Sequence, residues 1–374
     1  MKMEYKIGII TLPLRTNYGG ILQAYALMKI IKRLKGDKVV FLNRRHETQF
    51  KDKLKEFVIN IFYPKLNKVR KSYEVNFSKF IESEIFPISP KLESHDQTED
   101  FILNNNIKFM IAGSDQVFRV DYSESIYKDL FLNFNIPNLK RFSYAASFGH
   151  ESWKYPDKTV EIKNYLNKFE GVSVREVSGK AICENYFSIR ATVHLDPTLL
   201  LDKVDYLELI NKYGSKQNKP KDKYILAYLL DTSFEIETQL KNISSKLNCK
   251  IVWLNQPELT YRNYSDLKNK SKISIPTWLD AFSEADYVFT DSYHGTLFSI
   301  KFNKKFVVLG NQSRGISRFI TILTEFNLMD KMIYNIKELS IETLNKDIDY
   351  VDIEEKLEVL KIKSLDYLNK NLNH

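Results

Sequence analysis

Short apolar runs that alternate with helical patterns constrain this chain more than any other feature of its sequence. The first run, residues 7–10, is followed by a glycine-containing turn and by apolar residues that recur at helical spacing from Ile21 to Leu34. Gly36 then ends this helix, as glycine commonly does, and a second apolar run occupies residues 39–42. A strand, a helix and a second strand in this order predict a βαβ unit with parallel strands.

The same alternation continues along the chain. Further strands are expected at residues 109–112, 142–145, 172–174, 192–195, 224–230, 250–254, 287–290 and 306–309. A Lys- and Asn-rich stretch, residues 211–223, interrupts the series and has the composition of a linker. We therefore predict an α/β fold of two Rossmann-like domains facing a cleft.

The domain boundaries follow from these patterns. Residues 1–210 form the expected N-terminal domain, with a lysine-rich, mostly helical insertion at about residues 50–106. Residues 222–340 form the expected C-terminal domain. Residues 350–374 contain a long, charged, amphipathic helix that we expect to pack back on the N-terminal domain.

The charge balance limits the classes of partner. The chain has 56 Lys and Arg residues against 47 Asp and Glu residues, a formal net charge of +9. This excess suits nucleic acid, an anionic membrane face or an anionic small substrate. The basic residues are spread along the chain and no nucleic-acid-binding motif is present, so we expect no nucleic-acid partner.

Disulfide, metal and membrane-spanning classes are not expected. Cys183 and Cys249 cannot form a disulfide framework or a cysteine-based zinc site. His46, His95 and His194 show no ligand spacing with Asp, Glu or Cys, so no metal is expected. No apolar window approaches about 18 residues, and the N-terminus lacks the pattern of a signal peptide, so we expect a cytoplasmic protein.

Open α/β sheets bind ligands beyond the carboxyl ends of their strands, so we examined the residues that follow each strand. After the first strand, a helix begins at Asn17, Tyr18, Gly19 and Gly20. Backbone N–H groups at a helix start can face an anion or a substrate. A plain tight turn is the alternative interpretation.

A second candidate follows the strand at residues 109–112. Ser114, Asp115 and Gln116 place a hydroxyl, a carboxylate and an amide there. These residue types also cap helices, so an N-cap is the alternative.

Arginines follow two other strands. Arg175 ends the strand at residues 172–174 and offers a planar fork of donors for a carboxylate or phosphate; a salt bridge with Glu176 or another acid is the alternative. Arg314 and Arg318 follow the strand at residues 306–309. They could share one helix face and bind a phosphate, or pair with surface acids.

The segment around His294 carries the strongest signal. Ser292, Tyr293, His294 and Gly295 open a helix directly after the strand at residues 287–290. Histidine can serve as a general acid or base near neutral pH, and a helix N-terminus can bind an anion. The alternative is a histidine that merely caps or packs.

Residues 51–71 differ in kind from these sites. An apolar stripe at helical spacing is flanked by lysines; it consists of Leu54, Phe57, Val58, Ile61 and Phe62. Such a stripe could lie on an anionic membrane surface. It could equally dock on the protein's own sheet.

Six segments occur together in one order: T-N-Y-G-G-I-L-Q-A-Y-A-L, G-S-D-Q-V-F, S-Y-A-A-S-F-G, V-S-V-R-E, H-L-D-P-T-L-L-L and T-D-S-Y-H-G-T-L-F-S-I. Together they resemble the bacterial polysaccharide pyruvyl transferase family, over roughly residues 7–330. The resemblance implies two Rossmann-like domains in a GT-B-like arrangement. It also implies phosphoenolpyruvate as donor, with no further cofactor, and a cyclic pyruvate ketal bridging two hydroxyls of one sugar as product.

The resemblance implies an acceptor that is a surface polysaccharide or its lipid-linked precursor, with a galactose bridged at O4 and O6 as a family-level expectation. A lipid-linked acceptor would bring the chain to the inner face of the plasma membrane. Two other classes stay open. One is a GT-B glycosyltransferase that uses a nucleotide sugar, and the other is a non-catalytic, glycan-binding relative.

The resemblance and the residue types together suggest roles. Arg175 would bind the donor carboxylate or phosphate. His294, with the N–H groups around Gly295, would bind phosphate and act as general acid. Asp115 would be the base or the ligand of an acceptor hydroxyl, with Asn17 and Gly19 lining the same side.

One departure from the family pattern concerns the donor. Some members carry Arg-Leu-His where this chain has Ser292, Tyr293 and His294. We expect Arg314, Arg318 or a lysine such as Lys301 to supply the missing positive charge.

Overall fold

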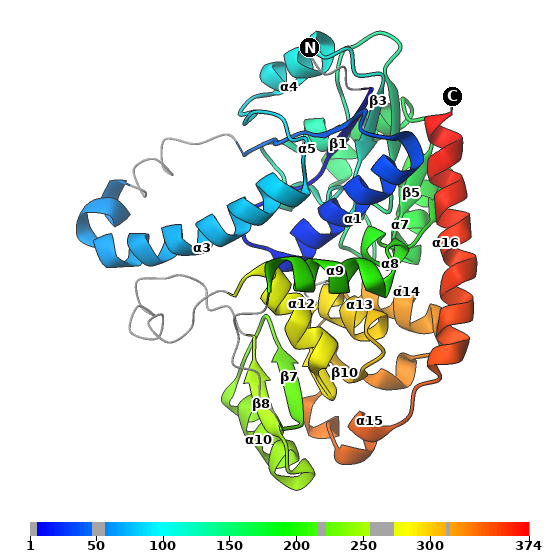
Figure 1. Cartoon of the computed structure of the whole chain (residues 1–374). Helices are drawn as coiled ribbons and strands as arrows, with labels where there is room; N and C mark the ends of the chain where they lie inside the picture. The colour runs from blue at the N-terminus through cyan, green and yellow to red at the C-terminus, as the bar shows by residue number, and fades with distance from the viewer. Residues whose placement is uncertain (1–5, 47–56, 215–221, 255–272, 312–314, 374) are drawn as a thin grey trace. The chain divides into compact units, whose positions relative to one another are not determined.

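The computed structural model describes residues 6–46, 57–214, 222–254, 273–311 and 315–373 (Figure 1). The chain divides into two compact units. The first comprises Met1–Phe62, Phe77–Leu200 and Glu358–His374, and the second comprises Tyr63–Asn76 and Leu201–Leu357. Residues 201–210, which the sequence analysis placed in the N-terminal domain, therefore belong to the second unit.

The first unit contains two parallel sheets and their helices. Its strands are β1 (Ile7–Ile10), β2 (Val39–Phe41), β3 (Phe109–Ala112), β4 (Lys140–Ser143), β5 (Val172–Val174) and β6 (Ala191–Val193). Its helices are α1 (Tyr18–Lys35), α4 (His95–Asn104), α5 (Tyr127–Leu130), α6 (Thr159–Leu166), α7 (Val177–Ile182) and α8 (Pro197–Leu200), with short turns η1 (Val120–Tyr122), η2 (Pro156–Lys158) and η3 (Cys183–Phe187). The main sheet has the order β2-β1-β3-β4, and β5 pairs with β6.

The second unit contains one five-stranded parallel sheet of order β11-β10-β9-β7-β8. Its strands are β7 (Tyr224–Tyr228), β8 (Lys250–Trp253), β9 (Tyr287–Thr290), β10 (Lys305–Leu309) and β11 (Met332–Ile333). Its helices are α9 (Lys203–Tyr213), α10 (Phe234–Leu247), α12 (Ile275–Glu284), α13 (Tyr293–Lys301), α14 (Ser317–Glu325) and α15 (Ile341–Asn345), with turns η6 (Met329–Lys331) and η7 (Ile336–Glu338). Two helices, α3 (Pro64–Glu84) and α16 (Tyr350–Leu372), contain residues of both units.

Each main sheet has a point at which its strand order reverses. In the first unit β2 pairs with one edge of β1 and β3 with the other. In the second unit β8 and β9 flank β7 in the same way. Right-handed crossovers put the helices of opposite turns on opposite faces, which leaves a crevice at the carboxyl ends of the two central strands. The polar segments after β1, β3, β7 and β9 are therefore the ones placed to bind ligands.

Burial explains why the strands are short and apolar on both faces. β1, β2 and β7 are buried along their whole length, as expected of strands covered by helices on both sides. One apolar cluster fills the first unit and includes Ile10, Met110 and Phe118, and a second cluster fills the second unit around Ile225 and Phe289. The predicted α/β class with parallel sheets is confirmed.

Candidate active site

The first site lies at the reversal point of the first unit. Thr11 follows β1, and Gly113, Ser114 and Asp115 follow β3. The Thr11 hydroxyl donates to the backbone carbonyl of Ser114 at 2.8 Å, which joins the two loops. The amide of Gln23, on α1, donates to the Thr11 hydroxyl at 3.2 Å. The loops after β1 and β3 and the start of α1 are thus held as one structure.

The start of α1 is a capped helix N-terminus. The Asn17 side chain accepts a hydrogen bond from the Gly20 backbone N–H at 3.2 Å, and Tyr18, Gly19 and Gly20 are buried. A Cβ atom at Gly20 would lie 3.4 Å from Asp115 Oδ2. The Asp115 carboxylate therefore lies close to the start of α1, where the positive end of the helix dipole lies.

Asp115 has an unusual backbone conformation. Its φ angle is +76°, in the left-handed region that non-glycine residues rarely adopt. The Asp115 carbonyl accepts hydrogen bonds from the backbone N–H groups of Val117 and Ser147, at 2.8 and 2.9 Å. No helix begins at Ser114 or Asp115, so the N-cap interpretation of this segment was wrong. Backbone strain of this kind is concentrated at functional sites.

Arg175 is a buried centre of ion pairs. Its guanidinium lies 3.2 Å from Asp115 Oδ1 and 3.0 Å from Asp196 Oδ2, and its Nε lies 3.9 Å from Glu176 Oε2. The side chain is 0% exposed. We expected this arginine to touch the donor, but no surface of it reaches solvent. The alternative, salt bridges with acids, describes the structure, and Arg175 orients Asp115.

The acids around Arg175 are themselves fixed. Asp196 Oδ2 accepts from the Ser114 hydroxyl at 3.1 Å, and its Oδ1 accepts from the Thr198 backbone N–H at 3.0 Å. Glu176 Oε1 accepts from the Phe148 backbone N–H at 2.9 Å. Every carboxylate of the cluster therefore has a partner that sets its position. Ser114 serves this network and does not line the pocket described next.

A pocket of about 250 Å³ opens over Asp115. Its polar lining comes from Asp115, Arg15, Asn17, His46 and Tyr122, and the Gly20 backbone also borders it. Burial lowers the pKa of His46, and the positive charges of Arg15 and Arg44 lower it further. The imidazole is therefore neutral at physiological pH, with Nδ1 3.1 Å from the Ser125 hydroxyl.

Arg15, His46 and Tyr122 were not predicted as site residues from the sequence. His46 lies after β2, where no residue pattern indicated a site. Arg15 lies in the loop that the analysis singled out, between β1 and Asn17. Tyr122 carried no sequence signal; it is placed by the Arg119 guanidinium, which lies 3.8 Å from its ring centre.

Gln116 points away from this pocket. Its Oε1 accepts from Arg119 Nη1 at 3.0 Å. A Cβ atom at Gly149, whose φ is +66°, would lie 2.1 Å from the same oxygen. The glycine of the S-F-G segment is thus required by the Gln116 side chain and by its own backbone conformation. We assign Gln116 a structural role, in which it binds Arg119 and packs against Gly149.

The second site lies at the reversal point of the second unit. Thr290 ends β9, and its hydroxyl donates to the Tyr228 carbonyl at the end of β7, at 2.6 Å. The Asp291 carboxylate accepts from the backbone N–H groups of Leu230 and Asp231, at 2.7 and 2.9 Å. Asp291 therefore holds the loop after β7 against the start of α13.

The start of α13 presents His294. Ser292 is the N-cap, and its hydroxyl accepts from the Gly295 backbone N–H at 3.4 Å. A Cβ atom at Gly295 would lie 2.3 Å from the Thr290 hydroxyl oxygen, so only glycine fits. His294 is 7% exposed, and its ring centre lies 5.5 Å from that of Tyr293. The helix is nine residues long, so its dipole favours an anion at this end.

Arg318 is the cation that the structure places beside Tyr293. Its guanidinium lies 5.3 Å from the Tyr293 ring centre, and its Nε donates to the Gly315 carbonyl at 3.3 Å. Lys301 is at the far end of α13, about 10 Å from His294 by helical rise, and its ammonium donates to the Leu201 carbonyl at 2.7 Å. Lys301 therefore does not supply the charge that we expected of it. Arg314 lies outside the described residues.

Comparison with known proteins identifies the family. A family model described as polysaccharide pyruvyl transferase matches residues 17–313. The chain belongs to this family. The match makes it a transferase of polysaccharide biosynthesis, and a comparison with curated proteins found no match.

Solved structures that resemble this transferase show its fold. A UDP-GlcNAc 2-epimerase from Methanocaldococcus jannaschii has a TM-score of 0.52 at 11% identity, covering 99% of this chain and 99% of that one. A putative UDP-N-acetylglucosamine 2-epimerase from Listeria monocytogenes has a TM-score of 0.51 at 10% identity, covering 96% and 91%. At such identities the likeness concerns the fold alone, which is of the GT-B kind with two Rossmann-like units.

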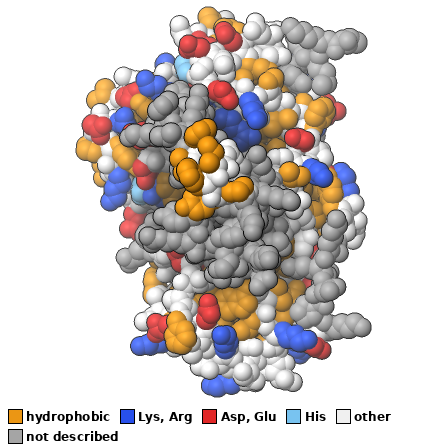
Figure 2. All heavy atoms as spheres, turned by 90° about the vertical axis from the view of Figure 1, so that its left-hand side faces the viewer, with side chains coloured by type: hydrophobic (Ala, Val, Ile, Leu, Met, Phe, Trp, Pro, Cys, Tyr) orange, Lys and Arg blue, Asp and Glu red, His pale blue; other side chains and the backbone are white. Residues whose placement is uncertain are grey.

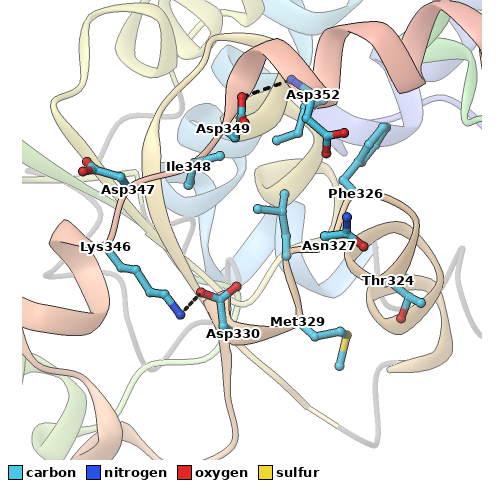
Figure 3. A pocket seen from close by; sticks show the side chains of 12 residues that line it. Thr324, Phe326, Asn327, Met329, Asp330, Lys346, Asp347, Ile348, Asp349 and Asp352 are labelled. Carbon is cyan, nitrogen blue, oxygen red and sulfur yellow. Dashed lines mark hydrogen bonds and ion pairs between the residues drawn. The ribbon is translucent and has the colours of Figure 1, made fainter.

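A larger hollow of the transferase, about 590 Å³, lies in the second unit and holds none of the expected site residues (Figure 3). Its acidic side chains have partners within the protein. Asp330 pairs with Lys346 at 2.7 Å, and Asp349 accepts from the Val351 and Asp352 backbone N–H groups at 3.1 Å, at the start of α16. These aspartates stabilise the helix start and the loop before it, so we assign the hollow no chemistry.

Two further properties bear on the transferase. None of its described helices combines the length and apolar character needed to cross a bilayer. In the part of the chain that the structure describes, no three or more His, Cys, Asp or Glu side chains are grouped as metal ligands would be.

Proposed function

We propose that this transferase moves the pyruvyl group of phosphoenolpyruvate onto two hydroxyls of one sugar and forms a cyclic ketal. The observation that carries the proposal is the Asp115 carboxylate. It borders a pocket at a strand-order reversal, in a strained backbone conformation, and is held by a buried arginine. A fixed carboxylate that borders a pocket is the kind of group needed to take a proton from a sugar hydroxyl.

Ketal formation from phosphoenolpyruvate requires a defined series of proton transfers and bond changes. A proton adds to the methylene carbon of phosphoenolpyruvate and makes C2 electrophilic. One sugar hydroxyl attacks C2 and gives its proton to a base. The second hydroxyl then forms a C2–O bond as the C2–O bond to phosphate breaks, and its proton leaves with inorganic phosphate. The enzyme must therefore supply a base for the acceptor, an acid for the donor and cationic contacts for phosphate and carboxylate.

We assign the acceptor to the first unit. Asp115 is the base, and Asn17 and the neutral His46 are hydrogen-bonding groups in the same pocket. An imidazole that is neutral can both donate and accept hydrogen bonds, which suits sugar hydroxyls. We keep galactose bridged at O4 and O6, in a surface polysaccharide or its lipid-linked precursor, as the proposed acceptor.

We assign the donor to the second unit. The N-terminus of α13 and His294 would bind the phosphate, with His294 as the general acid. Arg318 would add positive charge beside Tyr293, where some family members carry an arginine two residues before the histidine. Arg175 has no part in this contact because its side chain is buried among carboxylates.

Calorimetric titration tests the donor assignment. Phosphoenolpyruvate should bind the wild type saturably, and His294→Ala and Arg318→Ala should each weaken binding by about tenfold or more, as loss of a charge-assisted contact does. Lys337→Ala, an exposed substitution in the same unit, is the matched control and should bind normally. Binding of a nucleotide sugar in place of phosphoenolpyruvate would make the protein a glycosyltransferase. Binding of neither would favour a non-catalytic, glycan-binding protein.

A further inference from the structure

Four large apolar side chains of residues 57–62 face solvent. We call them the apolar patch: Phe57, Val58, Ile61 and Phe62 are 61%, 39%, 52% and 69% exposed. Figure 2, which views the left-hand side of Figure 1, shows hydrophobic side chains gathered on this face beside residues drawn in grey. The sequence left open whether this stripe docks on the protein's own sheet, and such exposure excludes that docking for the patch.

The spacing of the patch gives the segment one apolar face. Residues 57–62 are helical, and positions 57, 58, 61 and 62 fall on one side of a helix. Ile59 is only partly exposed, and the polar Asn60 lies at the position between the two apolar pairs. An exposed cluster of this kind, including two phenylalanines, marks an interaction surface.

The charge around the patch indicates the occupant. Between residues 51 and 71 the sequence has seven basic residues and two acidic ones: Lys51, Lys53, Lys55, Lys65, Lys68, Arg70 and Lys71 against Asp52 and Glu56. A second copy of this chain would bring two such basic segments together, which their repulsion opposes. Anionic lipid headgroups would neutralise them while the acyl region accepts the apolar face.

We propose that the apolar patch forms a docking surface for an anionic lipid membrane. Phe57, Ile61 and Phe62 enter the boundary between headgroups and acyl chains. The proposal goes beyond the transfer reaction and does not depend on it. It explains how an enzyme without a membrane-spanning helix among its described residues reaches an acceptor carried on a lipid.

Vesicle flotation with the full chain, in the absence of substrates, tests the proposal. Vesicles of phosphatidylcholine with about one-third phosphatidylglycerol are compared with phosphatidylcholine alone, at low and high salt. We expect the wild type to float with the anionic vesicles at low salt only. The double variant Phe57→Ser/Phe62→Ser should lose about tenfold or more in partitioning, because it removes the two largest inserted side chains.

Phe234→Ser is the matched control. This phenylalanine is 87% exposed but lies at the start of α10, without a comparable basic segment. Its replacement should leave flotation unchanged. Because all three side chains are exposed, the variants should keep the wild-type melting temperature.

Three results would overturn the proposal. The first is wild-type protein that ignores anionic vesicles at low salt. The second is a double variant that floats as well as the wild type. The third is a wild-type dimer in sedimentation that the double variant loses, which would show that a second copy covers the patch. None of these results bears on phosphoenolpyruvate binding, so the two proposals fail separately.

Discussion

Arg175 is the residue whose expected and observed roles differ most. Its type and its place after β5 indicated an anion-binding residue. The structure surrounds it with Asp115, Asp196 and Glu176, so that three carboxylates lie around one guanidinium. The cluster forms from segments far apart in the chain. No local sequence pattern predicts that Asp196, in the H-L-D-P segment, pairs with the Arg175 guanidinium.

Replacement of Arg175 should therefore act on stability as well as on turnover. Arg175→Met leaves buried carboxylates without their cation, and we expect a loss of about 3–5 kcal/mol in the free energy of unfolding. Urea denaturation measures this, with Arg190→Met, an exposed arginine of the same unit, as the control. Arg175→Lys keeps the charge but not the fork that reaches both Asp115 and Asp196. It should lower kcat while leaving KM for phosphoenolpyruvate unchanged; a KM effect alone would show that Arg175 binds the donor after all.

Two glycines offer a matched test of close packing. Gly295→Ala places a methyl group 2.3 Å from the Thr290 hydroxyl oxygen, and we expect a loss of about 1–3 kcal/mol in stability. Gly20→Ala meets nothing closer than 3.4 Å and lies in the first turn of α1, where alanine favours the helix. Thermal melting should therefore separate them, with Gly295→Ala lower and Gly20→Ala equal to or above the wild type. Equal melting temperatures would contradict the packing at Thr290.

Among the elements, α16 is held to the first unit by buried polar contacts. His194, after β6, has its Nδ1 3.3 Å from the Ser364 hydroxyl and its ring centre 4.6 Å from that of Tyr367. The Tyr367 hydroxyl donates to the Ser143 carbonyl at 2.9 Å. Burial, together with the smaller effect of the positive charge of Lys363, lowers the pKa of His194 to about 4.

This contact should make stability depend on pH. The pKa of His194 is lower in the folded protein than its ordinary value of about 6.5, so the unfolded chain binds the proton first as pH falls. The contribution is complete above about pH 6.5 and is lost as pH falls towards 4, by up to about 3 kcal/mol. Urea denaturation of His194→Gln across this range should show a flatter pH dependence than the wild type.

His95 is the control with the opposite sign. A hydrogen bond to Asp129 raises its pKa, although burial opposes the shift. Its stabilising effect is therefore present below pH 6.5 and lost as pH rises through the raised pKa. His95→Gln should lose stability mainly at low pH. If both variants respond alike, the pH dependence does not arise from His194.

Element positions were predictable where strands are apolar and bounded by turn residues. Residues 109–112 and 287–290 were predicted as strands, and β3 and β9 occupy these residues. β4 ends at Ser143, two residues earlier than expected, because Ala145 adopts a φ of +47° and cannot continue a strand. Helix α9 was not expected, although Asp202 and Asp205 form a capping box at its start. Only the end of α9, residues 211–213, falls in the stretch that was predicted as a linker.

For the whole molecule, the division into two units separates the proposed chemistry. Asp115 belongs to the first unit and His294 to the second. Asp115→Asn should reduce ketal formation by about 10²–10⁴-fold through loss of the base, with phosphoenolpyruvate affinity unchanged. His294→Ala should lose that affinity. Phosphate release measures turnover and calorimetry measures phosphoenolpyruvate affinity in both variants. Weakened phosphoenolpyruvate binding in Asp115→Asn would place the donor in the first unit.

The sequence sufficed to identify the polar segments that follow the central strands, but not the strand order or the residues that complete each site. The residues after β1, β3 and β9 could be singled out because parallel sheets bind ligands there. Arg15, His46 and Tyr122 join the first site only through the way its loops fold over one another. The stacking of Arg318 on Tyr293 likewise depends on how α14 lies against α13, which no spacing along the chain encodes.

The contacts between α16 and the rest of the first unit have a consequence for biosynthesis. The first unit begins with β1 near residue 7, yet it includes Glu358–His374, which a ribosome translates after all the strands of the second unit. Until then Ser143 and His194 lack their contacts with Tyr367 and Ser364, and the unit's surface at Gly171 is not yet covered by Asn371. The first unit is thus completed only after the strands of the second unit have been translated, although its own strands are translated first.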